Sequence, residues 1–390
     1  MSKTELNIGL IGAGFMGRAH ADAFRRAGLL DASLPARPRL YKIAERNDDF
    51  AASAAKALGF ERSTGDWRAL VADPEVDVVD ITSPNNLHYE MAMAAIEAGK
   101  HVYCEKPLAV RLEHAEAMQK EAAKRGVKTM VAFNNVKAPA ALLARELIRK
   151  GDIGGPIRFR GWFDQGFFSD PELPWSWRCS RSEAGSGALG DLGSHVISVA
   201  QFLMDEVDSV FATEQTFFPT RPMAAAGEGY AAKAGAGAER RKVENEDQIQ
   251  ALLRFKSGAG GVIEASRVAV GKVFGIYWEV CGTEGTIIMD GERFNELKIA
   301  RFSEPKPERG FKTLLVGSQV PQSRIFFGFD YGGGGLGYYD VKVIEVCDLI
   351  RGICGDGPCF PDFAFGLENQ RIIAAIEEAA AGGGWVSVSR

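Results

Sequence analysis

Short apolar runs alternate with amphipathic stretches over the first third of the chain. The run at residues 6–11 has no polar face, which is typical of a parallel strand buried on both sides by helices. The pattern predicts strands at residues 6–11, 40–44, 76–81, 101–104 and 128–133, and helices at 16–27, 48–58, 88–98 and 112–125. This alternation predicts a doubly wound parallel sheet, the Rossmann arrangement of an α/β protein.

The pattern changes after residue 133. A helix at 138–150, a strand at 157–163, an aromatic loop and an apolar helix at about 190–204 come first. Strands then alternate in the antiparallel manner at 210–217, 248–255, 261–268, 277–282 and 286–290, before helices at 340–351 and 367–381. We therefore expect a dinucleotide-binding domain at 1–133 and, at 134–390, a substrate-binding α+β domain with an open, largely antiparallel sheet.

Two glycine-rich segments interrupt the second part of the chain. Residues 219–242 are rich in Ala and Gly, and we expect a surface excursion there. Residues 332–337 lack the preceding strand and following helix of a phosphate-binding loop. We expect them to form a flexible loop that could lie near the substrate.

Composition and charge narrow the class of protein. The chain has 390 residues, of which 46% are hydrophobic and 25% charged, and a formal net charge of -5. These values are typical of a globular protein, and they argue against nucleic acid or an anionic membrane as the main partner. The six cysteines form no CxxC pair or Cys/His cluster, so we expect reduced thiols and no metal site. Without a leader or a membrane-length apolar run, we expect a cytoplasmic location.

A glycine motif follows the first strand and opens the first helix. Gly12 permits a tight turn, Gly14 lets the backbone approach a pyrophosphate, and Gly17 allows close packing of helix on strand. Phe15 and Met16 lie between the last two glycines. The helix N-terminus would face the anion, so this turn predicts a dinucleotide site.

The residue after the second strand indicates which dinucleotide binds. Glu45 could accept hydrogen bonds from both ribose hydroxyls of the adenosine half, which favours NAD over NADP. Its distance from the glycines exceeds the usual spacing of about 20 residues, which the loop at 30–38 explains. Arg46 could instead meet a 2′-phosphate, so NADP stays open at this point.

Two strand ends carry unusual chemistry. Ser83 and Asn85 follow the strand at 76–81, and Glu105-Lys106-Pro107 follows the strand at 101–104. The carboxyl ends of parallel strands line the cofactor crevice in such sheets. Pro107 restricts the backbone there. Lys106 could therefore donate to a substrate hydroxyl and stabilise alkoxide character as hydride leaves.

A candidate proton-transfer pair opens the apolar helix of the second domain. Asp191 and His195 are four residues apart, which on an α-helix places them on one face. Histidine titrates near neutral pH, which suits a base that takes a hydroxyl proton. An Asp/His pair at this spacing is also common as a simple surface contact, so its neighbours must decide its role.

The motifs at residues 12–17, 105–107 and 190–195, at these separations, resemble the Gfo/Idh/MocA oxidoreductases over nearly the whole chain. The resemblance implies that Lys106, Asp191 and His195 are catalytic and also bind substrate, acting across the interdomain cleft. It implies that the second domain forms a homotetramer or homodimer. Together with the motifs, it implies an NAD site made of Gly12, Gly14, Phe15, Met16, Glu45, Arg46, Ser83, Asn85, His88, Glu105, Lys106 and Trp177.

Within the family, the stretch from Trp177 and Arg178 to residue 189 and the long insertion are similar to inositol and levoglucosan dehydrogenases. The nearest likeness is a scyllo-inositol dehydrogenase that also oxidises L-glucose, so we expect NAD-dependent oxidation of a cyclic polyol or sugar, with Arg178 contacting substrate hydroxyls. Levoglucosan or another pyranose is the alternative. Where relatives often have Asn-x-Arg, this chain has Asn134-Asn135-Val136-Lys137, which leaves substrate contacts there open.

Two other functions occur on the resembled fold. An NAD-retaining glycosidase would eliminate an aglycone through transient oxidation, without net NADH. A regulator that senses NAD would bind it and turn nothing over. A sensor needs no proton-transfer set, so Lys106, Asp191 and His195 favour an enzyme.

Overall fold

The computed structural model describes residues 4–226, 233–235, 237–328 and 335–388. It divides into two compact units, the first made of Met1–Lys137 and Gly317–Glu368, the second of Ala138–Val316 and Asn369–Arg390. The first boundary lies close to the expected one at residue 133. Residues 317–368, however, belong to the first unit, whereas the sequence pattern assigned them to the second domain.

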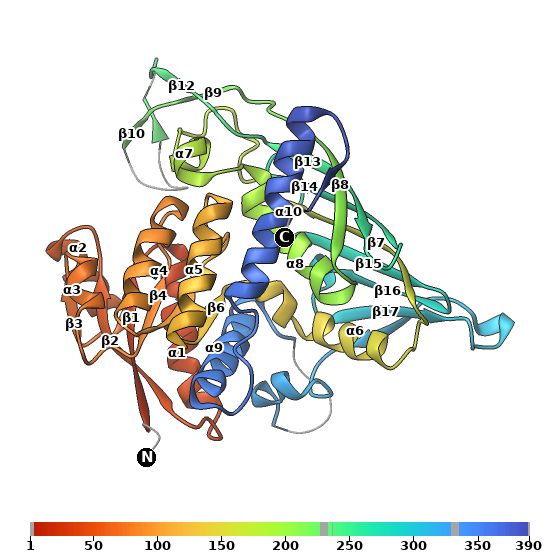
Figure 1. The fold of residues 1–390 in the computed structure, drawn as a ribbon, viewed down its shortest axis with the longest axis horizontal. Coiled ribbons are helices and arrows are strands. Elements are labelled where there is room, and N and C mark those ends of the chain that lie inside the picture. The colour runs from red at the N-terminus through yellow and green to blue at the C-terminus, as the bar shows by residue number, and fades with distance from the viewer. Residues whose placement is uncertain (1–3, 227–232, 236, 329–334, 389–390) are drawn as a thin grey trace. The chain divides into compact units, whose positions relative to one another are not determined.

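The first unit contains a six-stranded parallel sheet (Figure 1). Its strand order is β3-β2-β1-β4-β5-β6. The strands are β1 (Glu5–Ile11), β2 (Arg37–Ala44), β3 (Arg62–Thr64), β4 (Val78–Ile81), β5 (His101–Cys104) and β6 (Thr129–Val131). The strand order reverses direction at β1, so the carboxyl ends of β1 and β4 flank the point where ligands bind in such sheets. This confirms the predicted Rossmann arrangement.

Helices cover both faces of this sheet. They are α1 (Phe15–Leu30), α2 (Asp48–Leu58), α3 (Trp67–Val71), α4 (His88–Glu97), α5 (Leu112–Arg125) and α9 (Tyr338–Cys354). Helix α4 packs against α5, and α1 packs against α9. Val343, Val346 and Ile350 of α9 share one buried cluster with Ile8 and Val78 of the sheet. This apolar face explains why residues 317–368 return to the first unit.

The second unit contains a nine-stranded sheet, in which only β7 and β14 pair in parallel. Its order is β18-β17-β16-β15-β7-β14-β13-β8-β19. The strands are β7 (Pro156–Asp164), β8 (Val207–Gln215), β13 (Gln248–Phe255), β14 (Gly260–Ser266), β15 (Gly275–Gly282), β16 (Gly285–Asp290), β17 (Glu296–Arg301), β18 (Lys312–Leu315) and β19 (Val386–Ser387). The expected largely antiparallel sheet is confirmed.

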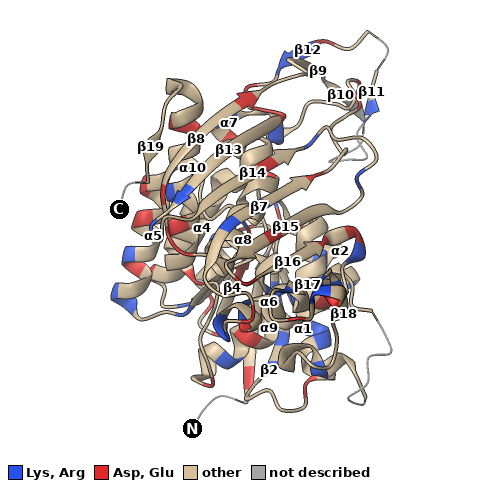
Figure 2. Cartoon of the chain, turned by 90° about the vertical axis from the view of Figure 1, so that its right-hand side faces the viewer, with Lys and Arg blue, Asp and Glu red and all other residues tan. Residues whose placement is uncertain are grey.

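Helices α6 (Pro139–Arg149) and α8 (Ser194–Leu203) pack on this sheet, and α10 (Phe363–Gly382) begins in the first unit and continues in the second. Figure 2 shows acidic and basic residues interspersed on the strands. One such pair joins neighbouring strands, because Arg158 of β7 donates to Glu279 of β15 at 2.8 Å. None of the helices in the described ranges is long and apolar enough to cross a membrane.

Several elements differ from the sequence pattern. The pattern missed β3, α3, β17 and β18, because short, partly exposed strands and a one-turn helix carry little periodicity. Helix α1 runs to Leu30 and β2 begins at Arg37, so the loop between them is shorter than expected. The 219–242 segment contains short strands, β9 (Thr220–Pro222), β10 (Ala224–Ala226), β11 (Lys233–Ala234) and β12 (Arg240–Lys242). The expected glycine-rich loop at 332–337 lies largely outside the described residues.

Candidate active site

The glycine turn after β1 has the close packing that its motif predicts. Gly12 has a positive φ of 95°, and its amide donates to the carbonyl of Ala44 at 3.0 Å. A Cβ on Gly17 would lie 2.1 Å from the Gly12 carbonyl oxygen, so only glycine fits there. A Cβ on Gly14 would meet nothing within 4 Å. The backbone at Gly14 is therefore open to a close approach by a ligand, and α1 begins there with no acidic residue in its first turn.

The carboxylate of Glu45 lies against this turn. Its Oε1 accepts from the amide of Ala13 at 2.6 Å, and its Oε2 accepts from the amide of Arg46 at 3.1 Å. The guanidinium of Arg46 stacks on the ring of Phe50, 3.9 Å from its centroid. A carboxylate at this place would repel a 2′-phosphate and accept from ribose hydroxyls, so the residues present fit NAD.

His88 joins the loops after β4 and β5. Its Nδ1 lies 2.9 Å from the carbonyl oxygen of Pro107, and its Nε2 lies 3.1 Å from that of Ser83. The ring is fully buried, and burial lowers its pKa. His88 thus holds the Ser83 and Pro107 backbones together, while Ser83 and Asn85 are half-buried at the same strand end.

The side chain of Glu105 points into a buried charged group that we call the first-unit cluster: His20, Asp80, Glu105, Lys342 and Glu345. Its Oε1 accepts from Lys342 Nζ at 3.1 Å and lies 3.1 Å from His20 Nε2. Its Oε2 accepts from the backbone amide of Lys106 at 3.0 Å. Burial would raise the pKa of Glu105, but the charge of Lys342 and the hydrogen bond with His20 hold it well below its usual range. The Glu105 carboxylate therefore ties the backbone amide of Lys106 to the buried side chains of His20 and Lys342.

The rest of the first-unit cluster completes these contacts. His20 Nδ1 lies 2.9 Å from Asp80 Oδ1, and Lys342 Nζ lies 3.1 Å from Glu345 Oε2. Burial opposes a charge on His20, but the carboxylate of Asp80 raises its pKa overall. Burial likewise opposes a charge on Lys342, whose pKa Glu105 and Glu345 raise. Lys106 itself is half-buried at the end of β5.

The helix that carries Asp191 and His195 begins with a π-helical turn, Leu189–Gly193, and continues as α8. A π turn bonds residues five apart rather than four, so the regular α-helical face expected for the pair does not hold here. Such turns occur frequently at functional sites. His195 is 6% exposed and meets the ring of Phe163 edge-on at 5.7 Å.

Arg178 and Asp191 are neighbours in the second unit. The Nε of Arg178 lies 3.8 Å from Asp191 Oδ2, with both side chains about a third exposed. The guanidinium carbon of Arg178 lies 4.4 Å from the ring centroid of Trp177. The structure thus brings the predicted substrate-binding Arg178 to one member of the predicted catalytic pair.

The segment in which this chain departs from the family pattern is buried in the first unit. Asn134–Lys137 forms a 3-10 turn. The Nζ of Lys137 donates to Asp348 of α9 at 2.6 Å and lies 5.4 Å from the ring centroid of Phe360. Lys137 is 5% exposed, so its charge is committed to holding α9.

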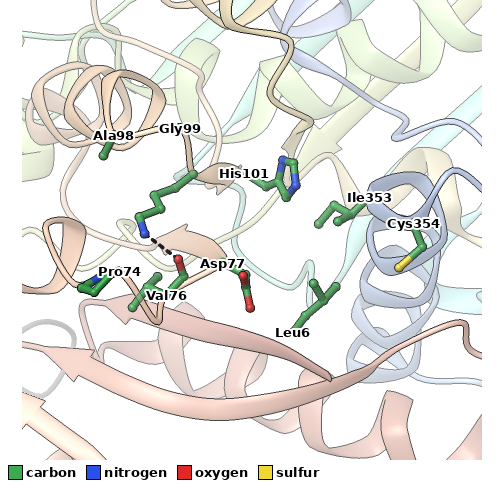
Figure 3. Close-up of a pocket in the computed structure, with 10 residues that line it drawn as sticks. Leu6, Pro74, Val76, Asp77, Ala98, Gly99, His101, Ile353 and Cys354 are labelled. Carbon is green, nitrogen blue, oxygen red and sulfur yellow. Dashed lines mark hydrogen bonds between the residues drawn. The ribbon is translucent and has the colours of Figure 1, made fainter. Parts of the chain in front are cut away.

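A cavity of about 390 Å³ in the first unit lies away from these groups. Figure 3 shows Leu6, Asp77 and His101 around it, together with Ile353 and Cys354 of α9. Leu6 and His101 belong to the amino-terminal ends of β1 and β5. Ligands of such sheets bind at the carboxyl ends, so this cavity is not the candidate active site.

The sequence pattern missed two kinds of supporting residue. Lys342 lies among Val341, Val343 and Ile344 on an otherwise buried stretch of α9, and a lysine flanked by apolar residues was its only signal. Asn245, Glu246 and Asp247 are also buried. The four consecutive polar residues 244–247, directly before β13, could have drawn attention to them.

Comparison with known proteins covers both units. A family model described as an oxidoreductase family with an NAD-binding Rossmann fold matches residues 6–133, and one described as a GFO/IDH/MocA C-terminal domain matches residues 141–288. The chain is 41% identical to levoglucosan dehydrogenase of Pseudarthrobacter phenanthrenivorans over 98% of each chain. It is 30% identical to myo-inositol 2-dehydrogenase of Thermotoga maritima over 74% of this chain and 76% of that one.

Solved structures of similar proteins match this chain over nearly its whole length. A crystal structure of an NAD binding oxidoreductase from Klebsiella pneumoniae is 61% identical, with a TM-score of 0.93, and the match covers 99% of this chain and 100% of that chain. A structure of levoglucosan dehydrogenase in complex with NADH and levoglucosan is 41% identical, with the same TM-score and coverage.

Proposed function

Because the chain belongs to the Gfo/Idh/MocA family of oxidoreductases, we propose that it uses NAD to oxidise a ring secondary alcohol of a cyclic sugar or polyol to the ketone. The observation that carries this proposal is the NAD-compatible glycine turn, held against Glu45, in a chain that also has a histidine and a carboxylate on one short helix. A regulator that only senses NAD would need the glycine turn, but not the histidine and carboxylate.

NAD, when bound, supplies the acceptor for the hydride that leaves the alcohol carbon. His195 accepts the hydroxyl proton, so the substrate loses one hydride and one proton and becomes a ketone. Lys106 donates to the same oxygen and stabilises the negative charge that develops on it. Asp191 orients His195 and the substrate, and Arg178 contacts further hydroxyls.

The residues proposed to hold NAD act in three ways. Gly12, Gly14, Phe15 and Met16 present the backbone and the start of α1 to the pyrophosphate. Glu45 accepts from the adenosine ribose, with Arg46 held aside on Phe50. Ser83, Asn85, Lys106 and Trp177 are proposed to contact the nicotinamide half, whereas Glu105 and His88 act through the backbones that they hold.

Levoglucosan is the substrate that we favour. The chain is 41% identical to a levoglucosan dehydrogenase, but 28% identical to a scyllo-inositol 2-dehydrogenase of Bacillus subtilis over 76% of this chain. The resemblance seen in the sequence favoured scyllo-inositol, with L-glucose as a second substrate, and these are the second candidates. A cytoplasmic location and a homotetramer or homodimer are further predictions.

A screen for NADH release tests the proposed function. The purified protein is assayed with NAD and, separately, levoglucosan, the inositol isomers, and D- and L-glucose, with NADP in parallel. We expect NADH release with levoglucosan and much slower turnover with NADP. Release of the aglycone from an aryl glycoside assayed in parallel, without net NADH, would identify the glycosidase instead, and turnover of none of these alcohols would contradict the proposal.

Changing His195→Ala separates chemistry from cofactor binding. Removal of a general base is expected to lower kcat by about 100-fold or more, while the dissociation constant of NADH, measured by fluorescence titration, stays close to that of the wild type. Equal losses in turnover and NADH affinity would count against the assigned role.

A further inference from the structure

The helix that carries Asp191 and His195 begins against a neighbouring backbone. A Cβ on Gly187 would lie 2.0 Å from the carbonyl oxygen of Glu246, so these two backbone segments approach to a distance that only glycine allows. The amide of Ala188 donates to that same carbonyl at 3.1 Å. The start of the helix is thus held in place by the backbone of Glu246, which is distant in sequence.

The side chain of Glu246 caps the same helix end. Its Oε1 accepts from the amide of Leu189 at 2.8 Å. A helix N-terminus has amides without partners within the helix, and the Glu246 oxygen satisfies one of them. Glu246 is 1% exposed, so no water competes freely for this amide.

Asn245 holds the Arg178 loop. Its Nδ2 donates to the carbonyl of Arg178 at 2.9 Å and to that of Gly185 at 3.4 Å. Its Oδ1 accepts from Arg267 at 3.1 Å. Neighbouring residues 245 and 246 therefore fix two different parts of the candidate site, the loop with Arg178 and the helix with Asp191.

A buried ion pair anchors these contacts to the sheet. The Nε of Arg267 donates to Asp247 Oδ1 at 2.9 Å, and both side chains are almost completely buried. Asp247 Oδ2 accepts from the amides of Phe217 and Phe218 at 2.8 and 3.0 Å. Arg267 directly follows β14, and Asp247 directly precedes β13. We call Asn245, Glu246, Asp247 and Arg267 the second-unit cluster.

We propose that the second-unit cluster positions Asp191, His195 and Arg178 for the oxidation. Glu246 sets the start of the helix that carries Asp191 and His195. This inference rests on the proposed function. None of its four residues is assigned a contact with substrate or NAD. They act through the backbones of Arg178, Gly187 and Leu189, so they are positioning residues.

Glu246→Ala tests this inference, with Glu244→Ala as the matched control. Glu244 lies two residues away and is exposed, and its carboxylate accepts from the amide of Arg181 without touching the helix that carries His195. A displacement of about 1 Å costs on the order of 100-fold in rate, so Glu246→Ala is expected to lower kcat by about 10- to 100-fold. NADH affinity should stay within about twofold of the wild type, because the glycine turn and Glu45 are unchanged.

Glu246→Gln guards against a variant that fails to fold. The glutamine oxygen can still accept from the amide of Leu189, so kcat in Glu246→Gln should lie well above that in Glu246→Ala. Normal kcat in Glu246→Ala, with faster amide exchange at residues 187–191, would overturn the inference, since the cap would then be lost without effect. If Glu246→Ala does not fold, Gly187→Ala replaces it, because the added Cβ forces the same two backbone segments apart, and normal kcat in that variant would overturn the inference.

A measurement without substrate keeps the inference separate from the proposed function. The pH titration of the His195 ring is followed by NMR, with the His195→Asn spectrum identifying its signal among the five histidines. A changed His195 titration in Glu246→Ala, and an unchanged one in Glu244→Ala, supports positioning even if no alcohol in the screen is oxidised. An unchanged titration in both variants overturns it, whatever the substrate proves to be.

Discussion

The two buried polar clusters differ in what they hold. In the first-unit cluster, titratable side chains from α1, β4, the end of β5 and α9 contact one another: His20 meets Asp80 and Glu105, and Lys342 meets Glu105 and Glu345. In the second-unit cluster, three consecutive residues and Arg267 bond mainly to backbone groups. The first cluster depends on balanced charge, and the second depends on close approach of backbones.

This difference predicts different responses to substitution. A buried charge that loses its partner is strongly destabilising, because its desolvation is no longer compensated. A lost side-chain bond to a backbone amide costs less stability, but it lets the backbone move. Damage to the first-unit cluster should therefore appear mainly in the free energy of unfolding, and damage to the second-unit cluster mainly in turnover.

Lys342→Met should have the largest effect on stability. It leaves three buried carboxyl groups, Asp80, Glu105 and Glu345, with His20 as their only basic neighbour within the first-unit cluster. Breaking such a group is expected to lower the free energy of unfolding by about 3–5 kcal/mol, measured by urea denaturation. Lys120→Met, an exposed change of the same type on α5, is the control. Adding Glu345→Gln to Lys342→Met should restore part of the loss, and no difference between Lys342→Met and the control would contradict the role of charge balance.

Gly187→Ala should have an intermediate effect and tests the dependence on backbone approach. The added Cβ would lie 2.0 Å from the Glu246 carbonyl oxygen, so the two backbones must separate. Such overpacking is expected to cost about 1–3 kcal/mol in unfolding free energy, and turnover should fall while NADH affinity holds. Gly260→Ala, where an added Cβ meets nothing within 4 Å, is the matched control. Equal turnover in the two variants would show that this contact does not position the helix.

Glu377→Gln should have the smallest effect, on the pH dependence of stability. Burial raises the pKa of Glu377 to about 7, Arg181 opposes the rise, and Glu246 and Glu214 add to it. The folded state therefore keeps this proton longer than the unfolded state, whose carboxyl has the ordinary pKa of 4.5. The Glu377 carboxyl therefore stabilises the folded state below pH 4.5, and this contribution is lost as the pH rises through about 7.

Thermal unfolding between pH 4 and 8 checks this sign. Glu377→Gln should flatten the decline in melting temperature over that range, and Glu378→Gln, an exposed neighbour on α10, should leave it unchanged. If the melting temperature of Glu377→Gln falls with pH as steeply as that of the wild type, a group other than Glu377 is responsible for the pH dependence.

Much of the fold follows from local pattern. The alternation of apolar runs and amphipathic stretches predicts the parallel sheet because both periodicities act over a few residues. The glycine turn is equally local, since Gly12 and Gly17 restrict their own backbone and its immediate neighbours. Lys106 and the Asp191/His195 pair were candidates for the same reason, each lying next to a recognisable element end, and their roles remain predictions.

The sequence by itself determined the glycine turn, the strand ends and the candidate residues, because these depend on contacts among neighbours in the chain. Only the tertiary structure decided that 317–368 returns to the first unit and that Lys342 meets Glu105 across 237 residues. It also decided that Glu246 caps the helix of Asp191. A buried polar side chain needs a partner, but nothing local specifies which distant residue supplies it.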